Sequence, residues 1–386
     1  MKEEIFSGFT QVFDAKPEHL YFAPGRVNLI GEHTDYNGGN VFPCALELGI
    51  YAGVRKRADQ KLRLFSQNSA TPVYEFDINH LSYQAKDSWT NYPKGVFKVI
   101  GDQEKAYPFG LDIYYLGDIP SSSGLSSSAA IEVLTATIIN DIYALGLGGV
   151  EIAKLAQKAE NTFVGVQCGI LDQFAVAMGR PSSAILLDTN TLNYSYVPLM
   201  LGDYRIVIAN TNKRRGLEDS KYNERRSECE SALRQLQTQL SISSLGELSA
   251  EEFESCIHLI ENETLRRRAR HAVYENLRTL KAFEALKKND IALFGRLMNA
   301  SHASLRDDYE VTGKELDTLA ELAQNFSGAA GARMTGAGFG GCTVNLVLND
   351  RIEDFIETVG ASYRKIIGYA ADFYVTSPSG GPRKLL

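Results

Sequence analysis

A chain of 386 residues can hold two domains of ordinary size, and its 44% hydrophobic and 23% charged residues are typical of a globular protein with a full apolar core. The net charge of −7 supplies no overall positive field for polyanions, so we expect no nucleic-acid partner. The five cysteines show no C-x-x-C spacing, the start has no signal-like apolar segment, and no apolar run could span a bilayer; we therefore predict a cytoplasmic protein without disulfides, structural zinc or membrane contact.

Strand-like segments dominate the first part of the chain. Runs enriched in Val, Ile, Tyr and Phe between turn residues predict strands at Leu20–Ala23, Val41–Arg55, Leu62–Phe65 and Leu111–Leu116. Apolar residues at helical spacing then predict a helix that starts at Ser126–Ser128 and reaches Leu145. The same pattern predicts a second helix over about Val150–Phe163.

The second half opens with a compact apolar strand at Tyr204–Ala209. After it we predict a long charged helix over about Leu217–Leu240, further helices through Leu322, and a strand at Cys342–Leu348. Asn, Tyr, Pro and Gly interrupt these patterns near Tyr194–Asp203. The chain is therefore predicted to have an α+β fold with two domains, residues 1–198 and 199–386.

Acidic and imidazole side chains gather in the glycine-framed segment Pro24–Gly39, where Glu32, His33 and Asp35 lie close together. Such a cluster suits a hydroxyl-dense ligand, because each sugar O–H needs an acceptor and each sugar oxygen a donor. Two other interpretations stay open here: the carboxylates could cap or solvate a loop, or His33 and Asp35 could form half of a metal site. None of the six histidines lies at ligand spacing from another, which disfavours the metal site.

Two loops of small residues carry a second kind of pattern. Pro120–Ala130 is rich in serine and enters the predicted helix, so its backbone N–H groups and the helix N-terminus favour phosphate, and its hydroxyls could bind phosphate or Mg²⁺. A serine-rich linker that ends in an N-cap explains the same composition. Met334–Cys342 has four glycines in six residues, as many nucleotide loops do, but so does a tight turn between strands. No Walker A motif occurs in the chain.

One carboxylate, Asp172, stands among apolar residues in the stretch Gly169–Phe174, and Glu160 lies upstream at the end of a predicted helix. Burying an unpaired carboxylate is costly, so Asp172 is expected to be paired or functional. A buried cap whose oxygens accept hydrogen bonds remains the alternative.

Together these four segments resemble the galactokinase branch of the superfamily that also contains homoserine, mevalonate and phosphomevalonate kinases. The Ser-rich and Gly-rich loops are similar to the superfamily's ATP motifs, and Gly25–Tyr36 is similar to the more restrictive galactokinase signature. One departure is Ser122, which stands where the family's loop often has glycine. The resemblance extends over Pro24–Cys342 and implies mixed β-sheets flanked by helices, with the active site in the cleft between two domains.

The resemblance also implies roles for individual residues. Asp172 matches the catalytic base and Arg26 the arginine that assists it, while the sugar ligands match Glu32, His33, Asp35 and Tyr222. The ATP-binding positions match Gly124, Leu125, Ser126, Ser127, Ser128, Gly336 and Gly338, and the Mg²⁺ ligands match Ser128 and Glu160. Residues 1–198 would bind the sugar and the ATP phosphates, and residues 199–386 would complete the cleft.

The implied activity is transfer of the γ-phosphate of MgATP to the C1 hydroxyl of galactose, with galactose and ATP as the partners of a cytoplasmic monomer. Two alternatives stay open: a kinase for another sugar such as N-acetylgalactosamine, and a non-catalytic galactose and ATP sensor. Known relatives of the sensor kind have an eroded serine–alanine segment, whereas Ser126–Ala130 is intact here and both Arg26 and Asp172 are present. The sequence therefore favours the enzyme.

Overall fold

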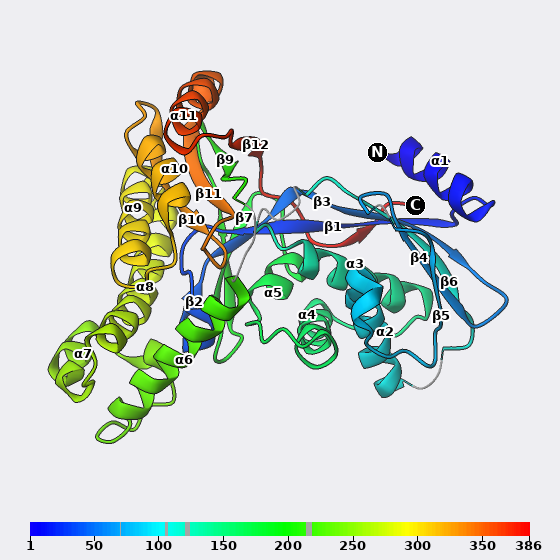
Figure 1. The fold of residues 1–386 in the computed structure, drawn as a ribbon, viewed down its shortest axis with the longest axis horizontal. Coiled ribbons are helices and arrows are strands. Elements are labelled where there is room, and N and C mark those ends of the chain that lie inside the picture. Colours follow the sequence, from blue (N-terminus) through cyan, green and yellow to red (C-terminus); the bar gives the residue numbers. More distant parts are fainter. Residues whose placement is uncertain (70, 105–106, 120–123, 214–217) are drawn as a thin grey trace.

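The computed structural model of the chain describes residues 1–69, 71–104, 107–119, 124–213 and 218–386 (Figure 1). Part of the serine-rich loop, Pro120–Ser123 with its departure at Ser122, lies outside these residues, and so does Leu217, the predicted start of the charged helix. No helix in the described ranges is both long enough and apolar enough to cross a membrane.

The strands predicted in the first half form the largest of the described sheets. Within the described ranges its six strands follow the order β13-β1-β3-β6-β4-β5. Their bounds are β1 His19–Asn28, β3 Pro43–Lys56, β4 Lys61–Ser66, β5 Tyr74–Asp77, β6 Leu111–Gly117 and β13 Arg383–Lys384. Neighbouring strands run antiparallel except β4 and β6, which run parallel. Strand β13 comes from the C-terminal end of the chain, so segments from both halves join one sheet.

Different helices cover the two faces of this sheet, as Figure 1 shows. Side chains alternate along β6: Ile113 and Tyr115 belong to one apolar core, whereas Tyr114 and Leu116 pack with α1 (Lys2–Phe13) in another. On the face opposite α1, helices α3 (Ser127–Ile142) and α5 (Leu171–Ala177) contact β1 and β3. Helices α2 (Asn91–Glu104) and α4 (Gly149–Ala159) pack against α3.

The second half is built around a smaller antiparallel sheet. In the described part of the chain its strands follow the order β10-β11-β9-β12, with bounds β9 Tyr204–Asn210, β10 Ala329–Thr335, β11 Cys342–Leu348 and β12 Asp372–Thr376. Its helices are α6 Glu218–Leu236, α7 Ala250–Cys256, α8 Glu263–Lys287, α9 Ile291–Asp307, α10 Lys314–Gln324 and α11 Ile352–Ile367. A further sheet contains β2 Asn40–Val41, β7 Ser183–Asp188 and β8 Tyr194–Pro198. Short helical turns are η1 Asp35–Asn37, η2 Ala85–Thr90, η3 Glu160–Val164, η4 Leu245–Glu247, η5 Ile257–Leu259 and η6 Asn349–Arg351.

The predicted α+β organisation is confirmed, and each predicted strand is present. The run Val41–Arg55 divides between β2 and β3. The helix predicted to reach Leu145 ends at Ile142, because Ala144 has a left-handed backbone with φ 54°. The helix over Val150–Phe163 is α-helical only to Ala159 and continues as the π-helical turn η3. The predicted boundary after residue 198 coincides with the end of β8 and stays a prediction.

Candidate active site

Two adjoining cavities lie where β1, α3 and α5 approach the end of β10. The larger has a volume of about 560 Å³ and the smaller about 200 Å³. Arg26, Asp172, Gly336 and Ala337 line both, so the cavities meet at these residues. Arg26 lies on β1, Asp172 in the first turn of α5, and Gly336 directly after β10.

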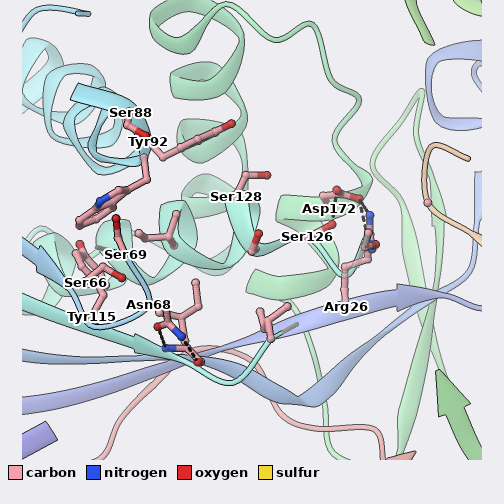
Figure 2. A pocket seen from close by; sticks show the side chains of 18 of the residues that line it. Arg26, Ser66, Asn68, Ser69, Ser88, Tyr92, Tyr115, Ser126, Ser128 and Asp172 are labelled. Atoms are coloured by element: carbon pink, nitrogen blue, oxygen red, sulfur yellow. Dashed lines mark hydrogen bonds and ion pairs between the residues drawn. The ribbon is translucent and has the colours of Figure 1, made fainter. Parts of the chain in front are cut away.

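An ion pair lies at this junction. Arg26, only 5% exposed, donates from Nε to Asp172 Oδ1 at 2.7 Å, and its Nη2 lies 2.7 Å from the same oxygen. Its Nη1 donates to the carbonyl of Gly124 at 2.7 Å, and Ser126 Oγ donates to the other oxygen of Asp172. Figure 2 shows Arg26, Asp172 and Ser126 together at one end of the larger cavity. The expectation that Asp172 is paired is therefore confirmed.

Glu32 lines the smaller cavity with a side chain that is almost fully buried. Its Oε1 accepts from Gly336 N at 2.8 Å, Thr335 Oγ1 at 3.0 Å and Arg333 Nη1 at 3.3 Å. Its Oε2 accepts from Asn28 Nδ2 at 2.9 Å. Because a carboxylate oxygen has two lone pairs, Oε2 can accept one further donor, such as a sugar hydroxyl.

His33 also lines the smaller cavity, from a left-handed backbone with φ 61°. Its Nε2 lies 3.2 Å from the carbonyl oxygen of Ala337, which can only accept, so this nitrogen carries the hydrogen. Nδ1 then accepts from the hydroxyl of Tyr36 at 2.8 Å, and that hydroxyl is 2.8 Å from the one of Tyr309. Burial, assisted by the nearby His271, lowers the pKa of His33 to about 3, so the ring is neutral at neutral pH.

Asp35 and Tyr222 complete the predicted sugar ligands, and both line the smaller cavity. Burial, followed by the charges of Asp172 and Glu32, raises the pKa of Asp35 to about 7. Burial and the nearby Asp35 hold the pKa of Tyr222 well above its usual value, so its phenol is an O–H donor. Gly169 packs against Asp35 so closely that an added Cβ would overlap the carboxylate.

Small residues form the end of the larger cavity beside the ion pair. Of the predicted ATP-binding positions, those that line it are Gly124, Ser126, Ser127, Ser128 and Gly336. Among the described residues, Leu125 and Gly338 line neither cavity. Leu125 is buried in the apolar core, and Gly338 packs against Val311, whose carbonyl oxygen an added Cβ would overlap.

Aromatic and apolar side chains line the rest of the larger cavity and form an aromatic wall that no sequence motif indicated. Its members include Ile50, Trp89, Tyr92, Tyr115, Ile119 and Ile131, with Ser66, Asn68, Ser69 and Ser88 beside them. Figure 2 shows Tyr92, Tyr115 and Asn68 at the end opposite Arg26 and Asp172. These residues come from several elements without a shared motif; the one available signal was Trp89, the single tryptophan of the chain.

The two predicted Mg²⁺ ligands line different cavities: Ser128 lines the larger and Glu160 the smaller. Glu160 is buried, and its Oε2 accepts from Gln173 Nε2 at 2.5 Å. Burial, followed by the charge of Asp172, raises the pKa of Glu160. In the described part of the chain no group of three or more His, Cys, Asp or Glu residues forms a protein-only metal site. The hydroxyl of Ser128 and the carboxylate of Glu160 are nevertheless the kind of ligand that fits Mg²⁺, which prefers oxygen ligands and takes few from the protein.

Family models match three parts of the chain: the galactokinase galactose-binding signature at residues 7–56, the N-terminal domain of GHMP kinases at 91–180, and their C-terminal domain at 282–365. The galactokinase of Clostridium beijerinckii is 57% identical, and the alignment covers 98% of both chains. The galactokinase of Lactiplantibacillus plantarum is 54% identical, again over 98% of both.

Solved structures are similar to this chain as well. Galactokinase from Lactococcus lactis, solved in complex with galactose, is 49% identical and matches with a TM-score of 0.97 over 100% of both chains. Mevalonate kinase from Methanococcus jannaschii, at 19% identity, shares the fold with a TM-score of 0.69 over 94% of this chain and 99% of its own.

Proposed function

The chain belongs to the galactokinase family of GHMP kinases, and from this premise we infer that it transfers the γ-phosphate of ATP to the C1 hydroxyl of galactose. The observation that carries the assignment of roles is the Arg26–Asp172 pair at the junction of two cavities. A phosphoryl group passing between two substrates must cross such a junction. Phosphoryl transfer requires positioning and charge stabilisation more than covalent chemistry.

The smaller cavity is proposed to bind galactose. Glu32 and Asp35 supply carboxylate acceptors, Tyr222 an O–H donor, and His33 a neutral ring that both contacts the cavity and holds Tyr36. A site built from such groups separates epimers well, because the wrong hydroxyl direction leaves buried polar groups unpaired.

ATP is proposed to occupy the larger cavity with its phosphates toward the ion pair. Gly124, Ser126, Ser127, Ser128 and Gly336 form the phosphate end, and the helix α3 that starts at Ser127 adds its positive N-terminus. The base then lies in the aromatic end with Trp89 and Tyr92. Leu125 and Gly338 contribute through the backbone conformation of their loops.

Asp172 is proposed to accept or orient the proton of the C1 hydroxyl, while Arg26 stabilises negative charge on the transferring group. Ser128 and Glu160 would hold Mg²⁺ together with the nucleotide phosphates, and the ion would neutralise phosphate charge. A monomer is proposed, and the use of ATP supports a cytoplasmic location.

The decisive variant is Asp172→Asn, with Asp102→Asn on the exposed side of α2 as the matched control. Loss of a positioned base is expected to lower kcat by about 10²–10⁴-fold while galactose binding persists. Turnover would be measured by coupled detection of ADP, and binding by calorimetry. Near-normal turnover of folded Asp172→Asn would overturn the role of Asp172.

The same coupled assay across galactose, N-acetylgalactosamine, arabinose and glucose tests the acceptor. We expect the highest kcat/KM for galactose. A higher kcat/KM for another sugar would identify that sugar as the preferred substrate. Binding of galactose and ATP without turnover would favour a sensor.

A further inference from the structure

The corner formed by Gly336 and Ala337 is the place where one backbone segment lines both cavities. Of these two cavities, as the described residues form them, Glu32 and His33 line only the smaller. The hydrogen bonds that hold the corner nevertheless come from these two side chains. Glu32 accepts from the amide of Gly336 at 2.8 Å, and His33 donates to the carbonyl of Ala337 at 3.2 Å.

The two oxygens of the Glu32 carboxylate are held unequally, since Oε1 has several donors and Oε2 accepts from Asn28 alone among the described residues. Arg333, which is fully buried, and Thr335 both donate to the oxygen that accepts from Gly336. Arg333 also donates to the carbonyl of Asn28 at 3.0 Å. That carbonyl lies 3.1 Å from Thr335 Oγ1, so Glu32 and Asn28 share the single hydrogen of the Thr335 hydroxyl. The end of β10 is thereby joined to β1 and to the sugar-side loop, and the position of Gly336 depends on Glu32.

His33 is fixed in the same way from the other side. The hydroxyl of Tyr36 donates to Nδ1, so the hydrogen stays on Nε2, where it meets the Ala337 carbonyl. The corner is thus held by one hydrogen bond at the amide of Gly336 and one at the carbonyl of Ala337. Both come from side chains that line the smaller cavity.

We propose that Glu32 is a positioning residue for the nucleotide, acting through Gly336, and that galactose and ATP therefore strengthen each other's binding. The proposal rests on the proposed assignment of the two cavities. A sugar hydroxyl on the free lone pair of Glu32 Oε2 restrains the carboxylate, and the restrained carboxylate holds the corner against the phosphates. Thermodynamic linkage requires the effect to be reciprocal and equal in both directions.

Thr335→Val tests this without touching either cavity, because Thr335 lines neither of them in the described part of the chain. The variant is isosteric and removes the hydroxyl hydrogen that Glu32 shares with the carbonyl of Asn28. Thr335→Ser keeps the hydroxyl and should restore the wild-type behaviour. Thr376→Val is the matched control, since the buried Thr376 hydroxyl has no hydrogen-bond partner among the described residues.

Calorimetric titration with a non-hydrolysable ATP analogue and Mg²⁺, without sugar, is the first measurement. We expect Thr335→Val to raise the analogue Kd roughly 3- to 10-fold relative to wild type, Thr335→Ser and Thr376→Val. In wild type, saturating galactose should lower the analogue Kd about fivefold or more, and the analogue should lower the galactose Kd by the same factor. Thr335→Val should reduce this factor, and its unfolding midpoint checks that it is folded.

Equal analogue Kd values for Thr335→Val and Thr376→Val would overturn the positioning role, and a wild-type galactose effect below about twofold would overturn the coupling. Failure of the proposed function is separate: wild type would then not phosphorylate galactose, while the sugar-free analogue Kd still decides the role of Glu32.

Discussion

At the scale of single residues, the carboxyl group of Asp35 has an unusual setting. It is buried beside Asp172 and Glu32, two groups of its own charge, and its pKa is raised from the model-peptide value of 3.8 to about 7. A hydroxyl donor in the smaller cavity would compensate this carboxylate. We therefore expect bound galactose to supply this hydroxyl donor.

The stability of the protein should report this pKa. A raised pKa means that the folded state holds the Asp35 proton more tightly than the unfolded state, so the stabilisation is complete below pH 3.8 and is lost as pH rises to about 7. The unfolding free energy of wild type minus that of Asp35→Asn should fall by up to about 1.4 kcal/mol per pH unit between pH 5 and 7, then level off. Urea denaturation of both proteins at four pH values measures it. A difference that grows with pH would contradict the assignment.

Cys168 offers a second residue-scale test. It is the least buried of the five cysteines, and all five are free in the described structure. Burial, followed by the charges of Glu160 and Asp172, raises the pKa of its thiol well above the usual range. Since only the thiolate reacts, iodoacetamide at pH 7.5 should modify Cys168 far more slowly than it modifies free cysteine. Mass spectrometry of the labelled peptide, with Cys168→Ser as control, measures the rate, and rapid stoichiometric labelling would refute the prediction.

At the scale of elements, the segment that leads into α5 packs closely against the turn η1. Gly169 precedes α5, and an added Cβ there would overlap Asp35 at the first position of η1. Gly169→Ala should therefore displace Asp35 and weaken galactose binding about tenfold or more, since a buried sugar hydroxyl left without its acceptor typically costs about 1–3 kcal/mol. Gly148→Ala is the control, because an added Cβ there meets only ordinary contact with Glu151 at 3.5 Å. Equal galactose Kd values for the two variants would show that η1 tolerates the shift.

Strand patterns were the easiest part of the fold to predict. Buried strands such as β6 are short apolar runs between turn residues, and that signal is local. Helix α1 was missed although Ile5, Phe9 and Phe13 recur at helical spacing, because the segment is short and half of its residues are polar. Helix α2 was missed for a similar reason, since its apolar face is interrupted by Gly95 and Gly101.

Part of the candidate site could likewise be predicted from the sequence, and part could not. The residues proposed to bind the sugar and the phosphates lie in recognisable motifs, so the resemblance indicated Arg26, Asp35 and Asp172 from the sequence alone. Glu32 accepts hydrogen bonds from Thr335 and Gly336, which lie about three hundred positions away in the sequence. No local pattern encodes such a contact. The aromatic wall around Trp89 was likewise formed by tertiary packing alone.

At the scale of the whole molecule, one apolar cluster contains residues from both halves. Val27 and Leu29 from the first half pack in the same cluster as Ile208 and Val344 from the second. The pairing of β13 with β1 and the buried ion pair between Arg333 and Glu32 add further links. Each link would have to break before either half unfolded alone.

We therefore expect a single cooperative unfolding transition, although chains of this length commonly unfold in steps. In differential scanning calorimetry the calorimetric and van't Hoff enthalpies should agree for the protein without ligands. Arg333→Met would leave Glu32 buried without its cation, a change that typically costs about 3–5 kcal/mol. Because Arg333 joins β10 to β1, the variant should shift the whole transition to lower temperature rather than melt one half first. Two resolved transitions in wild type would show that the shared core does not couple the halves. A low-temperature shoulder confined to Arg333→Met would instead identify this ion pair as the link that makes unfolding cooperative.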